Sequence, residues 1–428
     1  MGIVQTPQHF FNADPMQLNL LATRTWPDEQ RFFFNVLLPC KDAWGAAFCC
    51  GTSAVLRVEA LEACGGMATE TVTEDMLTTF RMAEHGWRTV FLNERLSLGL
   101  APEGLAEYVT QRSRWCLWAL QQSYTRWSFL GRGRVSLMNR LSAFDASLYW
   151  SVSFLFRLSV LAGSPLYWWF SISTLTATPS ELLHVLAPAV AAQSIFMAVL
   201  AGNRVSPVLT DVSQLLSSAV VLRTVAKVAV KPFGHPFKVT PKGMSRDGVR
   251  VEWGLMLPFL AVGLATAGGL LLNLGAWAPG RGDPSYALNM VWSLFNLVVM
   301  AVAAAACVEV PRPRQEERFA VLEAARIRRA DGSGDESCTV LDMSVTGARL
   351  AFEGAAAGDR LEVLLPGGLA LPFEVVRAGS GKVSGRFLAD PKARRALIAL
   401  LYTGRFTNEV AEVAPLRTLG RAMRRVFG

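Results

Sequence analysis

Long apolar stretches in the middle of the chain constrain its fold more than any other feature. A helix needs about 20 apolar residues to cross the hydrocarbon core of a membrane. The stretch 164–177 is short by this measure, and Ser164-Pro165 can instead kink one long helix. Arg223, Lys227 and Lys231 make the end of 208–230 amphipathic, so this segment either crosses or lies in the interface. We expect four to six crossings from stretches at roughly 143–161, 164–177, 182–201, 208–230, 253–278 and 286–308.

The composition agrees with a membrane protein. Hydrophobic residues make up 51% of the chain and charged residues only 18%, whereas soluble domains are about a quarter charged. These values exclude a disordered chain, a coiled coil, collagen and a disulfide scaffold. Basic residues gather at 132–140, 227–250 and 312–329, which the positive-inside tendency places in the cytosol, with 277–285 outside. No nucleic-acid-binding motif accompanies the net charge of +8, so we expect no nucleic-acid partner.

The cysteines and the first residues bear on the compartment. The 7 cysteines are scattered without metal-ligand spacing, which favours reduced thiols on a cytosolic side. Residues 1–40 lack the basic start and apolar run of a signal peptide. We therefore expect that any translocation begins at the internal helices.

Residues 1–140 have the pattern of a soluble α/β region. Short apolar runs at 46–48, 54–56 and 89–92 predict buried strands, and helical patterns cover 74–85 and 104–125. The opening, 1–7, is predicted to be a strand with nothing ahead of it to pair with. The region is therefore expected to begin in the middle of a fold.

Residues 311–428 change character again. Apolar and polar residues alternate between glycine-rich turns, which predicts a small antiparallel sheet or barrel. The tail 391–428 is predicted to be helical, and its end is a basic amphipathic helix that rests on protein or on lipid. The expected strands are 338–341, 348–352, 361–365, 373–377 and 385–388.

Thr73-Glu74-Asp75 opens the first of the predicted helices. Thr73 can serve as the N-cap, with acidic residues in the first turn, so the tripeptide can be a capping device. The functional alternative is that one of the two carboxylates acts as a general base.

Gln111-Arg112-Ser113-Arg114-Trp115 combines two cations with an indole. Arg114 can hold a diphosphate and Trp115 can stack on a sugar ring. The alternative is an interfacial helix whose Arg and Trp side chains lie at the headgroup level.

Phe48-Cys49-Cys50-Gly51-Thr52 follows a predicted strand with small residues. It is either a tight buried turn or part of a site. No histidine base neighbours Cys50 in the sequence, so we do not expect a thiolate nucleophile.

Three further motifs lie in polar segments. Residues 237–243 are either a basic loop beside the membrane or a site loop. Arg314 and Arg318 are spaced to hold a pair of phosphates, and a turn with Asp342, Ser344 and Gly347 can meet the edge of a base. The alternative is a solvated charge run followed by an ordinary turn.

The order of these motifs resembles the catalytic subunit of bacterial cellulose synthase. That family carries Thr-Glu-Asp, Gln-x-x-Arg-Trp, a loop with Phe-x-Val-Thr-x-Lys, Arg-x-x-x-Arg and Asp-x-Ser-x-x-Gly, and all of them stand here in that order. The resemblance covers nearly the whole chain and includes the opening Gln5-Thr6-Pro7. It implies the C-terminal part of a GT-A-like α/β glycosyltransferase domain with interfacial helices (1–140), an α-helical transmembrane region (141–310) with a cytosolic gating loop at about 231–250, a β-barrel PilZ domain (311–390) and a helical tail (391–428).

The resemblance also implies roles for individual residues. Asp75 would deprotonate the acceptor 4-hydroxyl, and Glu74 would help to position it. Glu103 would pair with Arg314 in the resting state until cyclic di-GMP breaks that pair. The other implied contacts are Trp115, Gln111, Arg112, Arg114, Cys50 and Gly51 at the acceptor or nucleotide; Phe237, Val239, Thr240 and Lys242 over UDP; and Arg314, Arg318, Asp342, Ser344 and Gly347 on cyclic di-GMP.

By the same resemblance, the protein polymerises glucose from UDP-glucose into β-1,4-glucan and exports it across the bacterial inner membrane. The family's Asp-x-Asp, which binds magnesium, does not occur in the sequence, so the magnesium ligands are expected in an N-terminal part that a separate polypeptide can supply. A membrane-anchored periplasmic subunit is a further expected partner. The alternatives are a non-catalytic membrane receptor for cyclic di-GMP, or a synthase of another β-glucan or of a mannan.

Overall fold

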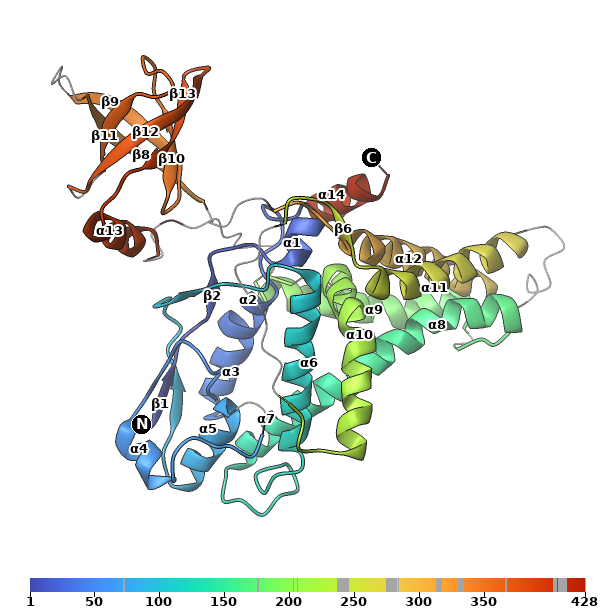
Figure 1. The fold of residues 1–428 in the computed structure, drawn as a ribbon. Coiled ribbons are helices and arrows are strands. Elements are labelled where there is room, and N and C mark those ends of the chain that lie inside the picture. Colours follow the sequence, from blue (N-terminus) through green and yellow to red (C-terminus); the bar gives the residue numbers. More distant parts are fainter. Residues whose placement is uncertain are drawn as a thin grey trace.

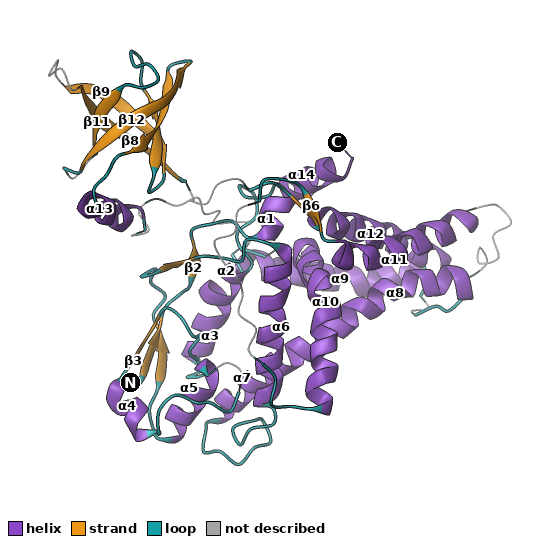
Figure 2. Ribbon diagram, viewed as in Figure 1, coloured by secondary structure: helices purple, strands orange, loops and turns teal. Residues whose placement is uncertain are grey.

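The computed structural model divides into an α/β region, a set of long apolar helices and a barrel (Figure 1). It describes residues 1–71, 74–174, 177–202, 204–205, 207–236, 246–274, 283, 285–312, 318–329, 335–365, 368–402, 406 and 414–427. Helices dominate the lower and right-hand parts of the view, and the strands of the barrel lie apart from them (Figure 2).

The α/β region is built on a small sheet in the order β3-β1-β4. The first strand, β1, pairs antiparallel with β3 and parallel with β4, so the predicted opening strand is confirmed. The predicted strand at 46–48 is wrong, because these buried residues form a loop whose following amides bond to side chains. The elements are β1 (Ile3–Gln5), β2 (His9–Phe10), α1 (Pro15–Asn19), α2 (Gln30–Phe32), a π-helical turn (Phe33–Leu37), α3 (Leu38–Ala43), β3 (Ala54–Leu56), α4 (Val58–Ala63), α5 (Asp75–Glu84), β4 (Thr89–Phe91), β5 (Leu98–Gly99) and α6 (Leu105–Gln122).

The apolar segment forms long helices. Pro165 lies inside one continuous helix, 137–170, so the apolar stretches 143–161 and 164–177 do not form separate helices. Within the described residues, five helices are long and apolar enough to cross a membrane. The elements are α7 (Leu137–Leu148), a π-helical turn (Tyr149–Ser153), α8 (Phe154–Phe170), α9 (Pro179–Val199), α10 (Pro207–Val230), β6 (Arg250–Val251), α11 (Trp253–Leu272), α12 (Tyr286–Ala306) and β7 (Val308–Glu309).

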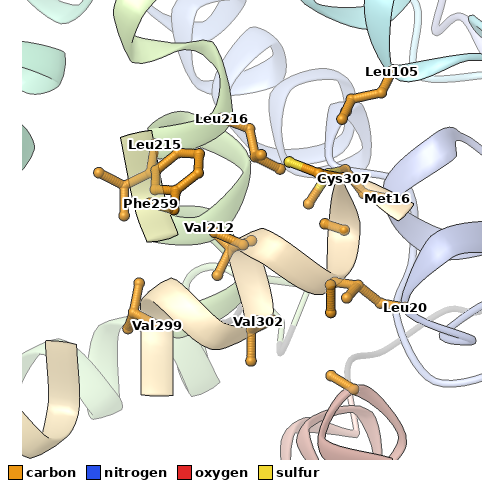
Figure 3. Close-up of a cluster of buried hydrophobic side chains, with 14 of the residues drawn as sticks. Met16, Leu20, Leu105, Val212, Leu215, Leu216, Phe259, Val299, Val302 and Cys307 are labelled. Carbon is orange, nitrogen blue, oxygen red and sulfur yellow. The ribbon is translucent and has the colours of Figure 1, made fainter. Parts of the chain in front are cut away.

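A large apolar core joins the α/β region to these helices. It brings Leu20 from the end of α1, Leu105 from α6, Leu216 from α10 and Val302 from α12 together, all almost fully buried (Figure 3). Burying such side chains stabilises the fold by roughly 1.5–3 kcal/mol each. The position of α6 is therefore fixed by the long apolar helices as well as by the α/β region.

The C-terminal region is a closed antiparallel barrel in the order β10-β13-β12-β11-β8-β9. Inward residues such as Leu350, Val363 and Phe373 alternate with outward polar ones. Gly385 has no room for a side chain, because a Cβ there would collide with the Glu374 carbonyl oxygen and the Phe373 ring. The elements are β8 (Phe319–Arg329), β9 (Asp335–Met343), β10 (Gly347–Ala351), β11 (Arg360–Leu364), β12 (Ala370–Gly379), β13 (Lys382–Phe387) and α13 (Pro391–Leu401).

The basic C-terminal helix, α14 (Pro415–Phe427), rests on protein. The Thr418 hydroxyl donates to the Thr25 carbonyl oxygen at 3.0 Å, and Ala422 is fully buried in the core shown in Figure 3. The chain therefore returns from the barrel to the segment that follows α1.

Candidate functional site

A buried glutamine shapes the turn that follows the loop at 46–48. Gln5 on β1 is fully buried, its Oε1 accepts from the Cys50 amide at 2.7 Å, and its Nε2 donates to the Thr52 carbonyl oxygen at 2.8 Å. Gly51 between them has φ +76°, a conformation that a side chain disfavours. The first strand thus fixes the turn from 45 residues away.

Asp75 lies against this turn from the start of α5. Its Oδ2 is 2.9 Å from the point that a Cβ of residue 51 would occupy, so only glycine lets the carboxylate approach. Its Oδ1 accepts from the Met76 amide at 2.9 Å. The pKa of Asp75 is raised to about 6, mainly by burial and also by the negative charge of Glu74, which together outweigh the lowering by the Met76 amide.

The predicted capping by Thr73 lies outside the described residues. The N-cap position is occupied by Glu74, whose exposed side chain makes no capping hydrogen bond. Asp75 is therefore the acidic residue of the first helical turn, where the positive end of the helix dipole favours a carboxylate.

Cys50 lies close to Asp75 and is a weak acid. Burial, followed by the charge of Asp75, raises the pKa of the Cys50 thiol well above its usual range. The thiol points to the Phe48 carbonyl oxygen at 3.8 Å. A protonated thiol agrees with the expectation that Cys50 is no nucleophile.

Arg112 is held inside the protein between two aromatic rings. Its guanidinium lies 4.4 Å from the Tyr108 ring centre and 4.3 Å from the Trp115 ring centre. It also forms an ion pair with Glu29, and burial lowers its pKa to about 10. Arg112 thus supports one face of Trp115, a role that sequence reasoning missed because Glu29 is far away in the chain.

The remaining residues of the α6 motif differ in exposure. Gln111 is buried, and its Oε1 is left without a hydrogen bond. Arg114 is half-buried, which lowers its pKa. The loop at 46–48 meets α6 where the Phe48 ring packs against Trp118, with the two ring centres 6.4 Å apart. Trp118 lies about one turn after Trp115 on α6. The turn beside Asp75 and the aromatic helix are therefore neighbours.

The predicted barrel site is assembled in part. Arg318 Nη1 lies 2.6 Å from Asp342 Oδ1, and Arg349 Nη2 lies 2.5 Å from Asp342 Oδ2. The buried Ser344 donates its amide to the Gly347 carbonyl oxygen at 2.8 Å, which forms the turn. Figure 1 shows these residues' strands well apart from α5 and α6.

Several predicted residues lie outside the described part of the chain. These are Arg314 of the barrel motif and the loop residues Phe237, Val239, Thr240 and Lys242. Glu103, the predicted partner of Arg314, forms an ion pair with Arg312 at 3.0 Å. The pair with Arg314 stays a prediction, and Arg312 is a residue that the motif did not indicate.

A magnesium site requires several donor side chains that lie close together. Among the described residues, no group of three or more His, Cys, Asp or Glu side chains is arranged to hold a metal ion. The residues in hand therefore do not form a magnesium site, and we derive no step through a metal.

Comparisons with known proteins match two parts of the chain. Residues 1–196 match the model of glycosyl transferase family group 2, and residues 312–403 match the PilZ domain. Cellulose synthase 1 of Komagataeibacter xylinus is 30% identical over 400 residues, which cover 89% of this chain and 25% of that protein. The chain is a homologue of bacterial cellulose synthase catalytic subunits.

Other cellulose synthases agree with this relationship. The UDP-forming catalytic subunit of Pseudomonas fluorescens is 29% identical over 370 residues, covering 85% of this chain and 50% of that protein. Against these cellulose synthases, the chain spans between a quarter and half of their length. A crystal structure of the PilZ domain of CeSA from a cellulose-synthesising bacterium covers 20% of this chain at 23% identity and a TM-score of 0.18.

Proposed function

We propose that the chain forms the acceptor-side and membrane part of a synthase that polymerises glucose from UDP-glucose into β-1,4-glucan under the control of cyclic di-GMP. The observation that carries the proposal is the Asp75 carboxylate, which Gly51 admits to the turn and whose pKa burial raises to about 6. A general base works best when its pKa lies near the working pH.

An inverting transfer is one in-line displacement at the anomeric carbon of the donor sugar. Asp75 accepts the proton from the attacking acceptor hydroxyl as the new glycosidic bond forms and the bond to UDP breaks. Trp115 stacks on the terminal acceptor sugar, and Arg112, which lies over the indole ring, helps to hold the ring in place. Arg114 meets the diphosphate of the leaving nucleotide. Holding both reactants in this geometry supplies much of the rate.

The barrel would bind cyclic di-GMP through Arg318 and the turn from Asp342 to Gly347. Arg318 already pairs with Asp342, so a bound phosphate would compete with that carboxylate for the guanidinium. A bound dinucleotide would thereby change the ion pairs that Asp342 forms at the start of the barrel. A periplasmic subunit and a polypeptide that completes the glycosyltransferase domain remain predictions from the resemblance.

We further propose four crossings of the bacterial inner membrane, with α10 lying in the interface. If the basic stretches 132–140, 227–250 and 312–329 are all cytosolic, an even number of helices must cross between each pair. The helices α8, α9 and α10 would make an odd number. Among the five apolar helices, α10 has the largest share of its residues buried against other parts of the protein. It packs along α6 (Figure 1). Labelling of single cysteines placed at each end of α10 from outside intact cells tests this, because labelling at either end contradicts it.

Substitution of Asp75 by Asn tests the function directly. The chain is joined to the N-terminal part of the homologous Komagataeibacter xylinus catalytic subunit, here called the completed synthase, and glucan synthesis is measured in membranes with UDP-glucose and cyclic di-GMP. Asp75→Asn should reduce synthesis about 1000-fold, within the usual range for loss of a general base. Binding of cyclic di-GMP should be unchanged. Normal synthesis by Asp75→Asn would exclude the assignment.

A further inference from the structure

The segment between the last apolar helix and the barrel is tied to the start of α6. Glu309 on β7 is almost fully buried, and its Oε1 accepts from the amide of Leu105, the first residue of α6, at 2.6 Å. Its Oε2 pairs with Arg246 Nη2 at 2.9 Å. Both oxygens of one carboxylate are thus used, each by a different segment of the chain.

A second tie lies one step further along the same segment. Arg312 Nη2 pairs with Glu103 Oε1 at 3.0 Å. The backbones of Arg246 and Arg312 also exchange hydrogen bonds at 2.9 and 2.6 Å. We call this group, Glu103, Leu105, Arg246, Glu309 and Arg312, the linker clamp. Its contacts lie on both sides of Gly104: Arg312 pairs with Glu103 before it, and Glu309 accepts from the Leu105 amide after it.

Physical chemistry explains why a carboxylate occupies position 309. The first amides of a helix have no partner within the helix and lie at the positive end of its dipole. A buried carboxylate is costly unless it is paired, and Glu309 obtains the Leu105 amide and the Arg246 guanidinium. A Cβ at Gly104 would collide with the Glu107 carboxylate and would lie 3.1 Å from Arg246 Nη2, so glycine leaves room for both side chains here.

The same helix carries the predicted acceptor residues. Trp115 lies ten residues beyond Leu105, which is about 15 Å along a rigid helix. A small rotation at the first turn therefore moves the indole and Arg114. At the linker clamp, the segment that follows α12 and leads to the barrel contacts the start of this helix.

We propose that Glu309 is a positioning residue that transmits movements of the barrel linker to α6 and hence to the acceptor site. The inference rests on the proposed function. It differs from the predicted pair of Glu103 with a barrel arginine, because Glu309 holds the helix amide itself and needs no residue of the barrel. Loss of its carboxylate should therefore uncouple the barrel from the site without weakening binding of cyclic di-GMP.

Hydrogen exchange of the peptide containing residues 104–108 tests this in the chain as it stands, with and without cyclic di-GMP. Glu309→Ala should raise exchange at the Leu105 amide at least tenfold, because the amide loses a hydrogen bond to a charged group. Glu309→Gln keeps an oxygen that accepts the amide, so its exchange should stay near that of the unaltered chain. Glu94→Gln is the matched control, because it removes an exposed carboxylate that is no member of the linker clamp.

The second measurement is the ratio of glucan synthesis with and without cyclic di-GMP in the completed synthase. Glu309→Ala should lower this ratio at least severalfold, whereas Glu94→Gln should leave it unchanged. If exchange at the Leu105 amide rises in Glu309→Ala but the synthesis ratio does not change, Glu309 only caps α6 and the proposal is wrong. If exchange does not change, Glu309 does not cap α6 either.

Failure of the proposed function has a different signature. If the completed synthase makes no glucan at all, that function is wrong, but exchange still reports on the clamp. Cyclic di-GMP should then alter exchange at residues 104–108 in the unaltered chain and not in Glu309→Ala. Identical responses in both would overturn the inference.

Discussion

The barrel and the region around Asp75 bring their candidate residues together over very different distances in the sequence. In the barrel, Arg318 reaches Asp342 across 24 residues, and Ser344 bonds to Gly347 within one turn. Around the catalytic candidates, Gln5 reaches Cys50 across 45 residues and Tyr108 reaches Glu29 across 79. The candidate residues of the barrel thus come from neighbouring strands, whereas those of the candidate acceptor site depend on contacts between distant segments. Variants should therefore separate the two regions cleanly.

The largest effect in this comparison is expected at Arg112. Arg112→Ala removes the ion pair with Glu29 and the contacts with Tyr108 and Trp115. Breaking a largely buried pair costs a few kcal/mol, so synthesis by the completed synthase should fall about 100-fold. Arg112→Lys should lose less, since the charge remains. Equal loss of cyclic di-GMP binding, measured by isothermal titration, would contradict the separation of the two regions.

Arg318→Ala tests the opposite side. It should weaken binding of cyclic di-GMP about 30-fold, as expected for loss of a charge-assisted contact to phosphate. Synthesis without cyclic di-GMP should not change. Arg360→Ala on the same barrel is the control, because its side chain is exposed and lies outside the predicted site. Unaltered binding by Arg318→Ala would remove this residue from the site.

Gly385→Ala sharpens the view of the barrel as a self-contained unit. The added methyl group collides with the Glu374 carbonyl oxygen and the Phe373 ring, so the free energy of unfolding should fall by about 1.5 kcal/mol. Gly379→Ala, also on β12–β13, meets open space and should change little. Thermal denaturation followed by proteolysis of the barrel measures both. Loss of α6 protection in Gly385→Ala would mean that the regions unfold together.

The smallest effect is a displacement of the pH profile. Because the pKa of Asp75 is about 6 and the base must be ionised, synthesis should decline as the pH falls below about 6. Glu74→Gln removes a negative charge that raises this pKa, so the decline should move to lower pH. The exposed Glu59→Gln serves as the control. A shift to higher pH would contradict the electrostatic account.

The same contrast explains what could be predicted from the sequence. Alternation along single strands predicted β9 to β13, because their inward and outward residues are set locally. The strand β8 was missed, since its Ala, Leu and Glu residues also suit a helix. The segment 46–48 was wrongly predicted as a strand, because its burial comes from distant side chains rather than from a paired neighbour.

The candidate site shows a similar division. The motifs indicated Asp75, Trp115 and Asp342 as candidates by residue type and order, and their roles stay predictions. They could not indicate that Arg112 is taken up by Glu29, or that Arg312 and Glu309 hold α6, because those partners come from other parts of the chain. Long-range pairing of this kind leaves no periodic signal in the sequence.

The tight packing at Gly385 also bears on where a dinucleotide would contact the barrel. The Phe373 ring fills the space beside it, and Leu350, Val363 and Val375 occupy the rest of the interior with almost no exposure. Among the described residues of the barrel, these side chains pack the interior around Gly385. The candidate residues lie outside this packed interior: Asp342 pairs with Arg318 and with the exposed Arg349. We therefore expect a nucleotide to be sensed on the outside of the barrel, next to the segment that joins the barrel to the apolar helices.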